Sequence, residues 1–330
     1  MKQPQIQTSL LPSIHDDAPY DFTFIDLFAG IGGTRLGFEA VGGRCVFTSE
    51  WDIHAQKTYQ ANFGETPHGD ITKIASKDIP DFDVLLAGFP CQPFSSIGKR
   101  AGFLHKTQGT LFYDVARIIK DKRPKAFLLE NVSGLLTHDK GKTLATILEV
   151  LQELEYDVHY QLINAADFGV PQMRKRVYIV GFDKNSLGLN TVNFTFPIGR
   201  PSEHVNIGEF LEKGVSGYSI SKRLQNNYLF KLHDGRPLLI DGTSKGPAKT
   251  LVASYHKIQR LTGTFVKDGE TGLRLYTANE CKALMGFPKS FKVPVSRTQM
   301  YRQFGNSVVV PVIKAIAESM HSYIVKETRR

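Results

Sequence analysis

The first half of the chain alternates short apolar segments with segments of helical periodicity, and this alternation constrains the fold more than any other feature. Strands are predicted at residues 22–29, 45–50, 83–88, 126–130, 157–164 and 176–182. Apolar residues recur with helical spacing at 34–41, 54–63, 111–122 and 143–156. Because strands that alternate with helices form βαβ units, we expect an α/β fold with a mostly parallel sheet.

The pattern changes after residue 184. Between about residues 185 and 272, Gly and Pro are scattered among short strand-like pieces, and no long amphipathic helix is indicated. This predicts a second, smaller domain of irregular β character. Helical spacing returns at 277–285 and at 312–324, where Val312, Ile316 and Met320 share one face. We expect this last helix to pack against the sheet of the first domain.

Composition and charge further limit the class of protein, its partners and its compartment. Of the 330 residues 41% are hydrophobic, which excludes a wholly disordered chain, and the net charge of +9 mildly favours a polyanionic partner. Three cysteines cannot form a disulfide framework. No apolar run approaches the ~18 residues of a membrane span. Residues 1–21 are polar and contain proline, which predicts a flexible arm without a signal peptide. We expect a reduced, cytoplasmic protein.

A glycine-rich turn follows the first predicted strand, in the run Asp26-Leu-Phe-Ala-Gly30-Ile-Gly32-Gly33. Bare backbone at such a turn can approach a nucleotide-like ligand closely. The spacing is neither G-x-G-x-x-G nor that of a phosphate-binding loop. Glu50 ends the next strand, where an acid can bond a ribose hydroxyl, and Asp70 follows a further helix. Each feature alone is weak evidence, because a solvated loop contains the same residue types.

Cys91 differs from the other two cysteines in its surroundings. A lone cysteine is more often a small buried residue than a nucleophile, and that interpretation is favoured for Cys45 and Cys281. Cys91 follows an apolar strand, and the segment 84–113 around it holds three basic residues and no acid. Positive surroundings favour the reactive thiolate. Cys91 is therefore a candidate nucleophile.

Glu130 and two arginines are candidate partners of Cys91. Glu130 ends another predicted strand, so its carboxyl group can face the same crevice. Arg174 and Arg176 precede a further strand and supply forked donors for a carboxylate or a carbonyl oxygen. Taken singly, each of these side chains is equally well explained as a solvated residue.

Together these segments resemble the cytosine-C5 DNA methyltransferases, in particular bacterial type II restriction-modification methylases, with the family's motifs in their usual order. The matching segments are 24–33, Glu50-Trp51, Gly69-Asp70-Ile71, Pro90-Cys91-Gln92, Glu130-Asn131-Val132, Gln172 with Arg174 and Arg176, 279–288 and 303–308. The resemblance implies a Rossmann-like methyltransferase sheet with a smaller, irregular β-rich target-recognition domain. It divides the chain into an arm (1–21), a catalytic and cofactor-binding domain (22–184), the target-recognition domain (185–272) and a C-terminal part of the catalytic domain (273–330).

The resemblance also implies a cofactor, S-adenosylmethionine, and no metal. Phe28 would lie against the adenine and Glu50 would hold the ribose. Trp51 would contact the adenine edge and Asp70 the adenine amino group. The full set implied for the cofactor is Phe28, Ala29, Gly30, Gly32, Gly33, Glu50, Trp51, Asp70, Leu111, Asn306 and Ser307.

The implied reaction is methyl transfer to C5 of a flipped-out cytosine in a specific duplex DNA sequence. The Cys91 thiolate would attack C6 and make C5 nucleophilic, while Glu130 hydrogen-bonds N3 and the exocyclic amine. Arg176 would bond the cytosine O2, and Arg174 would orient Glu130. A stacked base is out of reach of these groups, so the target must leave the helix. The base that removes the C5 proton is not evident in the sequence.

DNA contacts are expected from Ser95, Lys99 and Arg100 in the acid-free segment, and from Thr250, whose Thr-Leu pair resembles a family landmark. Gln108 stands where the family often has Arg, which leaves one contact open. The DNA sequence that is read, and the side chains that read it, do not follow from the chain. We expect a monomer on double-stranded DNA, associated with the nucleoid. It would protect host DNA from a cognate restriction endonuclease that shares its site.

Three alternative functions fit the chain less well. An RNA cytosine methylase of the same fold would carry Cys-Phe-Thr in its recognition region, and none occurs here. A zinc-dependent cytosine deaminase would need Pro-Cys-x-x-Cys, but Phe94 stands at the second cysteine position. An inactive DNA-binding relative is disfavoured because Cys91, Glu130 and both arginines are present.

Overall fold

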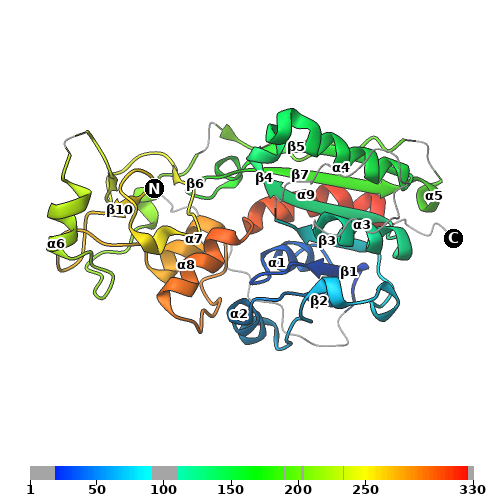
Figure 1. Ribbon diagram of the computed structural model, residues 1–330, viewed down its shortest axis with the longest axis horizontal. Helices are drawn as coiled ribbons and strands as arrows, with labels where there is room; N and C mark the ends of the chain where they lie inside the picture. The colour runs from blue at the N-terminus through cyan, green and yellow to red at the C-terminus, as the bar shows by residue number, and fades with distance from the viewer. Residues whose placement is uncertain (1–18, 91–110, 189–190, 202–203, 233, 326–330) are drawn as a thin grey trace.

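A mixed six-stranded sheet forms the centre of the molecule, with the strand order β2-β1-β3-β4-β7-β5 (Figure 1). The computed structural model describes residues 19–90, 111–188, 191–201, 204–232 and 234–325. The strands of the central sheet are β1 (Phe22–Leu27), β2 (Gly43–Ser49), β3 (Val84–Gly88), β4 (Ala126–Val132), β5 (Tyr156–Asn164) and β7 (Lys175–Asp183). The predicted α/β fold is confirmed.

The sheet is parallel over its first four strands and antiparallel at β7. β1 pairs in parallel with β2 and β3, and β3 pairs in parallel with β4. β7 runs antiparallel to both β4 and β5. The expectation of a mostly parallel sheet is therefore confirmed, and β7 is the strand of the described sheet that runs against the others. The physical reason for this reversal is the short connection 165–174 between β5 and β7, since a parallel return needs a crossover of a dozen or more residues.

Helices cover both faces of the sheet. Alternate residues of β1 enter separate cores: Phe22 and Phe24 pack with α1, α2 and α9, whereas Ile25 and Leu27 pack with α3 and α4. The helices are α1 (Gly33–Glu39), α2 (Ile53–Phe63), α3 (Leu111–Lys122), α4 (Lys142–Glu153), α5 (Lys184–Leu187), α6 (Lys222–Leu224), α7 (Ala278–Met285), α8 (Arg297–Asn306) and α9 (Val310–Ile324). The predicted helix 111–122 is confirmed, whereas α8 was not predicted.

The last helix returns to the first part of the chain. Val312, Ile316 and Met320 of α9 are fully buried in the core that also holds Phe22 and Phe24 of β1. α9 also packs along α1. The prediction that the C-terminal helix packs against the sheet is confirmed.

A second, smaller group of elements lies beside the sheet, at the left of Figure 1. It contains two small parallel pairs, β8 (Leu238–Ile240) with β10 (Thr264–Val266), and β9 (Ala248–Lys249) with β6 (Gln172–Met173). The irregular β character predicted for 185–272 is thus observed, and the domain boundaries stay predictions. Across the described ranges, no helix combines the length and apolar character needed to cross a bilayer.

Candidate active site

Residues that follow β1, β2, β3 and β4 line a pocket of about 490 Å³. The carboxyl ends of parallel strands are where ligands bind in open α/β sheets. The predicted residues that line it are Phe28, Ala29, Gly30, Gly33, Glu50, Trp51, Asp70, Leu111, Glu130, Arg174, Arg176, Asn306 and Ser307. The segments expected to hold a cofactor and those expected to act on a base therefore share one space.

The glycine turn after β1 is built by close packing. Gly32 does not line the pocket, and it has a positive φ of 85°. A Cβ at Gly32 would lie 2.3 Å from the ring of Phe63 in α2. A Cβ at Gly33 would lie 2.9 Å from Ser307 Oγ. Only glycine therefore fits at position 32. At Gly33 the turn is in close contact with the C-terminal segment that carries Ser307.

Glu50 joins the glycine turn to the helix that follows β2. Its Oε2 accepts a hydrogen bond from the Gly30 N–H at 2.8 Å, and its Oε1 accepts one from the Asp52 N–H at 2.8 Å. Asp52 in turn caps α2 by accepting from the His54 N–H at 2.8 Å. Burial raises the pKa of Glu50, and the backbone N–H groups of Asp52, Gly30 and Trp51 oppose that rise. The carboxyl group is thereby fixed at the pocket wall.

Trp51 and Asp70 extend the same wall toward solvent. The Trp51 side chain is 74% exposed although it lines the pocket, so its ring face is free for contact. Asp70 accepts hydrogen bonds from the Thr72 hydroxyl at 2.8 Å and the Thr72 N–H at 3.1 Å. These bonds hold the pKa of Asp70 below its usual value, so its carboxylate stays an acceptor.

Glu130 and Arg176 meet at the inner end of the pocket. β4 and β7 are antiparallel with Val132 opposite Arg176, so Glu130 is the diagonal neighbour of Arg176. The Arg176 Nε donates to Glu130 Oε1 at 2.9 Å, and both side chains are nearly buried. On the other side, Glu130 is paired in register with Gly88 of β3. The strand register therefore brings Glu130 beside both Arg176 and the end of β3.

Burial governs the charge of this inner end. It raises the pKa of Glu130, against the opposing effects of Arg176 and Arg174. It also lowers the pKa of Arg174 to about 10. A carboxyl group with a raised pKa keeps its proton to higher pH, as a hydrogen-bond donor to a base requires.

Arg174 contacts backbone rather than Glu130. Its Nη1 donates to the Leu251 carbonyl at 3.1 Å, and its Nη2 donates to the carbonyls of Gly305 at 3.0 Å and Ser307 at 2.7 Å. The expectation that Arg174 orients Glu130 is thus not met by a direct contact, because Arg176 occupies that place. Arg174 instead joins the segment after β9 to the C-terminal end of α8.

The end of β3 leads to the predicted nucleophile. The Asn131 side-chain amide donates to the Phe89 carbonyl at 2.9 Å, which fixes the chain just before Pro90. Phe89 and Pro90 line the pocket, and Cys91 is the next residue in the sequence. Cys91, Ser95, Lys99, Arg100 and Gln108 lie outside the described residues.

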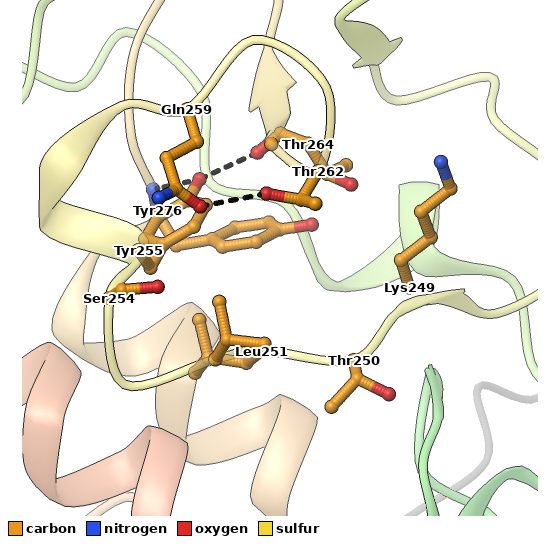
Figure 2. A pocket seen from close by; sticks show the side chains of 11 residues that line it. Lys249, Thr250, Leu251, Ser254, Tyr255, Gln259, Thr262, Thr264 and Tyr276 are labelled. Atoms are coloured by element: carbon orange, nitrogen blue, oxygen red, sulfur yellow. Dashed lines mark hydrogen bonds between the residues drawn. The ribbon is translucent and has the colours of Figure 1, made fainter.

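Thr250 lies at a different, smaller cavity of about 10 Å³, shown in Figure 2. Its hydroxyl donates to the Met173 carbonyl at 2.6 Å, which ties β9 to β6. The buried hydroxyls of Tyr276 and Thr264 line the same cavity and have no hydrogen-bond partner among the described residues. A space of this size holds about one water molecule. Thr250 therefore does not line the large pocket.

Several residues that line the pocket were not assigned a role from the sequence, among them Asn131, Arg302 and Gln303. Asn131 lies inside a matching motif, Gln303 begins the last one and Arg302 directly precedes it. The spacing of four between Arg302 and Asn306 would have placed both on one helix face, had α8 been predicted. In the part of the chain that the structure describes, no cluster of His, Cys, Asp and Glu is arranged to hold a metal ion.

Comparisons with known proteins identify the family of the chain. The model of the C-5 cytosine-specific DNA methylase family matches residues 22–322. The type II methyltransferase M.BsuFI of Bacillus subtilis is 63% identical over 298 residues, which cover 90% of this chain and 72% of that protein. The type II methyltransferase M.MspI of Moraxella sp is 59% identical over 300 residues, covering 91% and 70%.

A solved structure shows the same fold at lower identity. The Dnmt2 methyltransferase of S. pombe superposes with a TM-score of 0.72 at 21% identity, covering 91% of this chain and 98% of that one. At that identity the likeness supports the fold alone. The family match and the two type II relatives carry the assignment further. The chain therefore belongs to the C-5 cytosine-specific DNA methylases, and it is a DNA cytosine-5 methyltransferase of the type II restriction-modification class.

Proposed function

We propose that the protein transfers a methyl group from S-adenosylmethionine to C5 of a cytosine that is flipped out of duplex DNA, through a covalent bond between Cys91 and C6. The observation that carries this proposal is the shared pocket. Glu50 at the glycine turn and the Glu130–Arg176 pair line one space of about 490 Å³. A methyl donor and a base can therefore meet there.

The residues at the outer end of the pocket fit the cofactor. Each oxygen of Glu50 accepts one backbone N–H and keeps a lone pair for a ribose hydroxyl. The ionised Asp70 is an acceptor for an exocyclic amino group, and the exposed Trp51 ring offers a flat surface to an adenine. S-adenosylmethionine, when bound, supplies the methyl group that C5 takes.

The inner end fits an activated cytosine. The Cys91 thiolate bonds to C6, and the electron pair of the C5=C6 bond moves to C5, which becomes the nucleophile. After methylation, C5 gives its proton to a base, the C5=C6 bond re-forms and the C6–S bond breaks, so that the thiolate leaves. Protonated Glu130 donates to N3, which stabilises the charge that develops on the ring. Arg176 lies beside Glu130 and donates to the cytosine O2.

The position of Glu130 supports the proposal of base flipping. Its side chain is 12% exposed at the inner end of the pocket, in register with the buried end of β3. A base stacked in a duplex cannot bring its N3 edge to such a group, so the nucleotide must rotate out of the helix. We propose that the protein does so as a monomer bound to double-stranded DNA.

Covalent trapping tests the proposal. A duplex that carries 5-fluorocytosine at the target has no C5 proton to lose, so the Cys91–C6 bond should persist after methylation. With S-adenosylmethionine, intact-mass spectrometry should show one protein–DNA adduct. Cys91→Ser should form none, while Cys45→Ser, which changes a cysteine in β2 away from the pocket lining, should form it fully. An active enzyme that gives no adduct, or an adduct on Cys91→Ser, would overturn the mechanism.

We further propose that methylation protects host DNA from a cognate restriction endonuclease, in keeping with the type II relatives. Bisulfite sequencing of DNA from cells that express the protein would give the methylated sequence. Plasmid from the same cells should then resist an endonuclease that cuts this sequence. Plasmid from cells that express Cys91→Ser should be cut, and equal cleavage of both plasmids would contradict the protective role.

A further inference from the structure

Gln303 of α8 lines the pocket but takes no part in the reaction proposed above. Its side chain is nearly buried, with 8% exposed. A buried amide needs partners for both its N–H donors and its oxygen, because an unpaired polar group is costly away from water. The partners that Gln303 has lie in α2, far away in the sequence.

The Gln303 amide joins two residues one turn apart on α2. Its Nε2 donates to the His54 carbonyl at 2.8 Å, and its Oε1 accepts from the Thr58 hydroxyl at 2.9 Å. Thr58 is fully buried. Residues four apart lie on the same face of a helix, so the planar amide spans one turn of α2. Both the position and the rotation of that turn are thereby fixed.

The turn that Gln303 holds carries the cofactor wall. α2 begins directly after Trp51 and Asp52, and Ala55 of its first turn also lines the pocket. The Asp52 N–H donates to Glu50, which in turn accepts from the Gly30 N–H. A displacement of the first turn of α2 would therefore move the carboxyl group of Glu50.

Gln303 also belongs to the opposite wall. Asn306 and Ser307 follow it at the end of the same helix, and both line the pocket. We infer that Gln303 is a positioning residue for the cofactor, which sets the separation between the Glu50–Trp51 wall and the Asn306–Ser307 wall. This inference rests on the proposed use of S-adenosylmethionine, and it adds a residue that acts through α2 rather than by contact with the reacting atoms.

Asn62 provides a matched control at the other end of α2. Its amide also ties α2 to the C-terminal part of the chain, by donating to the Lys292 carbonyl at 2.8 Å and accepting from the Lys292 N–H at 2.7 Å. Asn62 lies two turns beyond His54 and does not line the pocket. It therefore shares the bridging geometry of Gln303 without its place beside Glu50 and Trp51.

The test compares variants with the wild-type protein by two measurements. Calorimetry gives the Kd of S-adenosylhomocysteine, and steady-state kinetics give kcat and the KM values for cofactor and DNA. Gln303→Met should raise the Kd about tenfold, equivalent to about 1.4 kcal/mol, and should raise the cofactor KM by a similar factor. The kcat at saturating cofactor and the KM for DNA should change less than about twofold. Asn62→Ala should leave the Kd unchanged while lowering the melting temperature. Gln303→Glu, which keeps the acceptor for Thr58 and loses the donor to His54, should give an intermediate Kd and serves if the Met variant does not fold.

Two outcomes would overturn the inference. One is an unchanged Kd in both Gln303 variants. The other is a fall in kcat with equal rises in both KM values, since that marks a general structural defect. Failure of the wild-type protein to bind S-adenosylhomocysteine would instead remove the proposed cofactor itself, so the two failures are distinguishable.

Discussion

Two glutamate–arginine pairs in this molecule have the same chemistry and opposite surroundings. Glu130 and Arg176 lie at the inner end of the large pocket, joined by one contact of 2.9 Å. Among the described residues, Arg176 is the only donor to the Glu130 carboxyl group, and Oε2 is left open. The pair thus keeps hydrogen-bonding capacity that the fold does not use.

Glu280 and Arg274 form the opposite case. Both side chains are essentially inaccessible, at 1% and 0% exposed. Each oxygen of Glu280 accepts two hydrogen bonds, all of 2.8 Å. Oε1 accepts from Arg274 and from the Glu212 N–H. Oε2 accepts from Arg274 and from the Thr277 N–H. Arg274 also donates to Asp268 at 2.9 Å. Contacts within the fold thus satisfy the hydrogen-bonding capacity of the Glu280 carboxylate.

The difference separates a carboxyl group that holds the chain together from one that keeps an oxygen available to a ligand. The saturated pair joins α7 to the segments that carry Glu212 and Asp268, so its loss should destabilise the molecule. The open pair leaves a buried acid incompletely paired, which costs stability and leaves an oxygen for a ligand. Stability and reaction rate should therefore respond to different pairs.

The largest effect on stability is expected from Arg274→Met. Without the guanidinium, Glu280 is left as an uncompensated buried acid, and the unfolding free energy should fall by about 3–5 kcal/mol. Urea unfolding followed by circular dichroism would measure this fall. The methylation rate per folded molecule should stay within about threefold of wild type. A variant as stable as wild type would remove the contrast between the two pairs.

A smaller effect, on the rate of methyl transfer rather than on stability, is expected from Arg176→Lys. The charge remains but the forked guanidinium is lost, and with it a charge-assisted hydrogen bond of about 1.5–3 kcal/mol. The single-turnover rate should fall about 10–100-fold, while the unfolding free energy changes by less than about 1 kcal/mol. The opposite pattern, an unchanged rate with a large loss of stability, would make this pair structural as well.

The smallest effect is a pH dependence of stability. Burial raises the pKa of Glu130 above its unfolded value, so the folded state binds its proton more tightly than the unfolded state. Stability contributed by that proton is present below the unfolded pKa and is lost as pH rises through the folded pKa. Glu130→Gln cannot lose this proton. Its melting temperature relative to wild type should therefore rise as pH is increased from 4 to 8, and a constant difference would contradict the assignment.

Local periodicity was enough to predict most of the fold. The strand at 157–164 and the helix at 111–122 were found because their apolar residues follow one clear period. α8 was missed because only Met300, Tyr301 and Phe304 of its ten residues are large, apolar and buried. Its position is fixed by contacts such as that of Gln303 with α2. The direction of β7 was missed because a period of two is the same in parallel and antiparallel strands.

The site could be predicted as a set of residues but not as a set of contacts. Glu50, Glu130 and Arg176 stand in motifs that are visible in the chain, and all three line the pocket. Which arginine meets Glu130 depends on the β4–β7 register, which no single segment contains. The roles of Gln303 and Asn131 depend on α2 and on the end of β3 in the same way.

One measurement tests the contrast most directly: the single-turnover rate of methyl transfer in Glu130→Gln and Glu280→Gln, compared at a temperature where both variants are folded. The loss of an acid that acts on the base should slow Glu130→Gln by about 10²–10³-fold. Glu280→Gln should transfer within about threefold of the wild-type rate and should be the less stable protein. A slow Glu280→Gln beside a Glu130→Gln of normal rate would contradict the account.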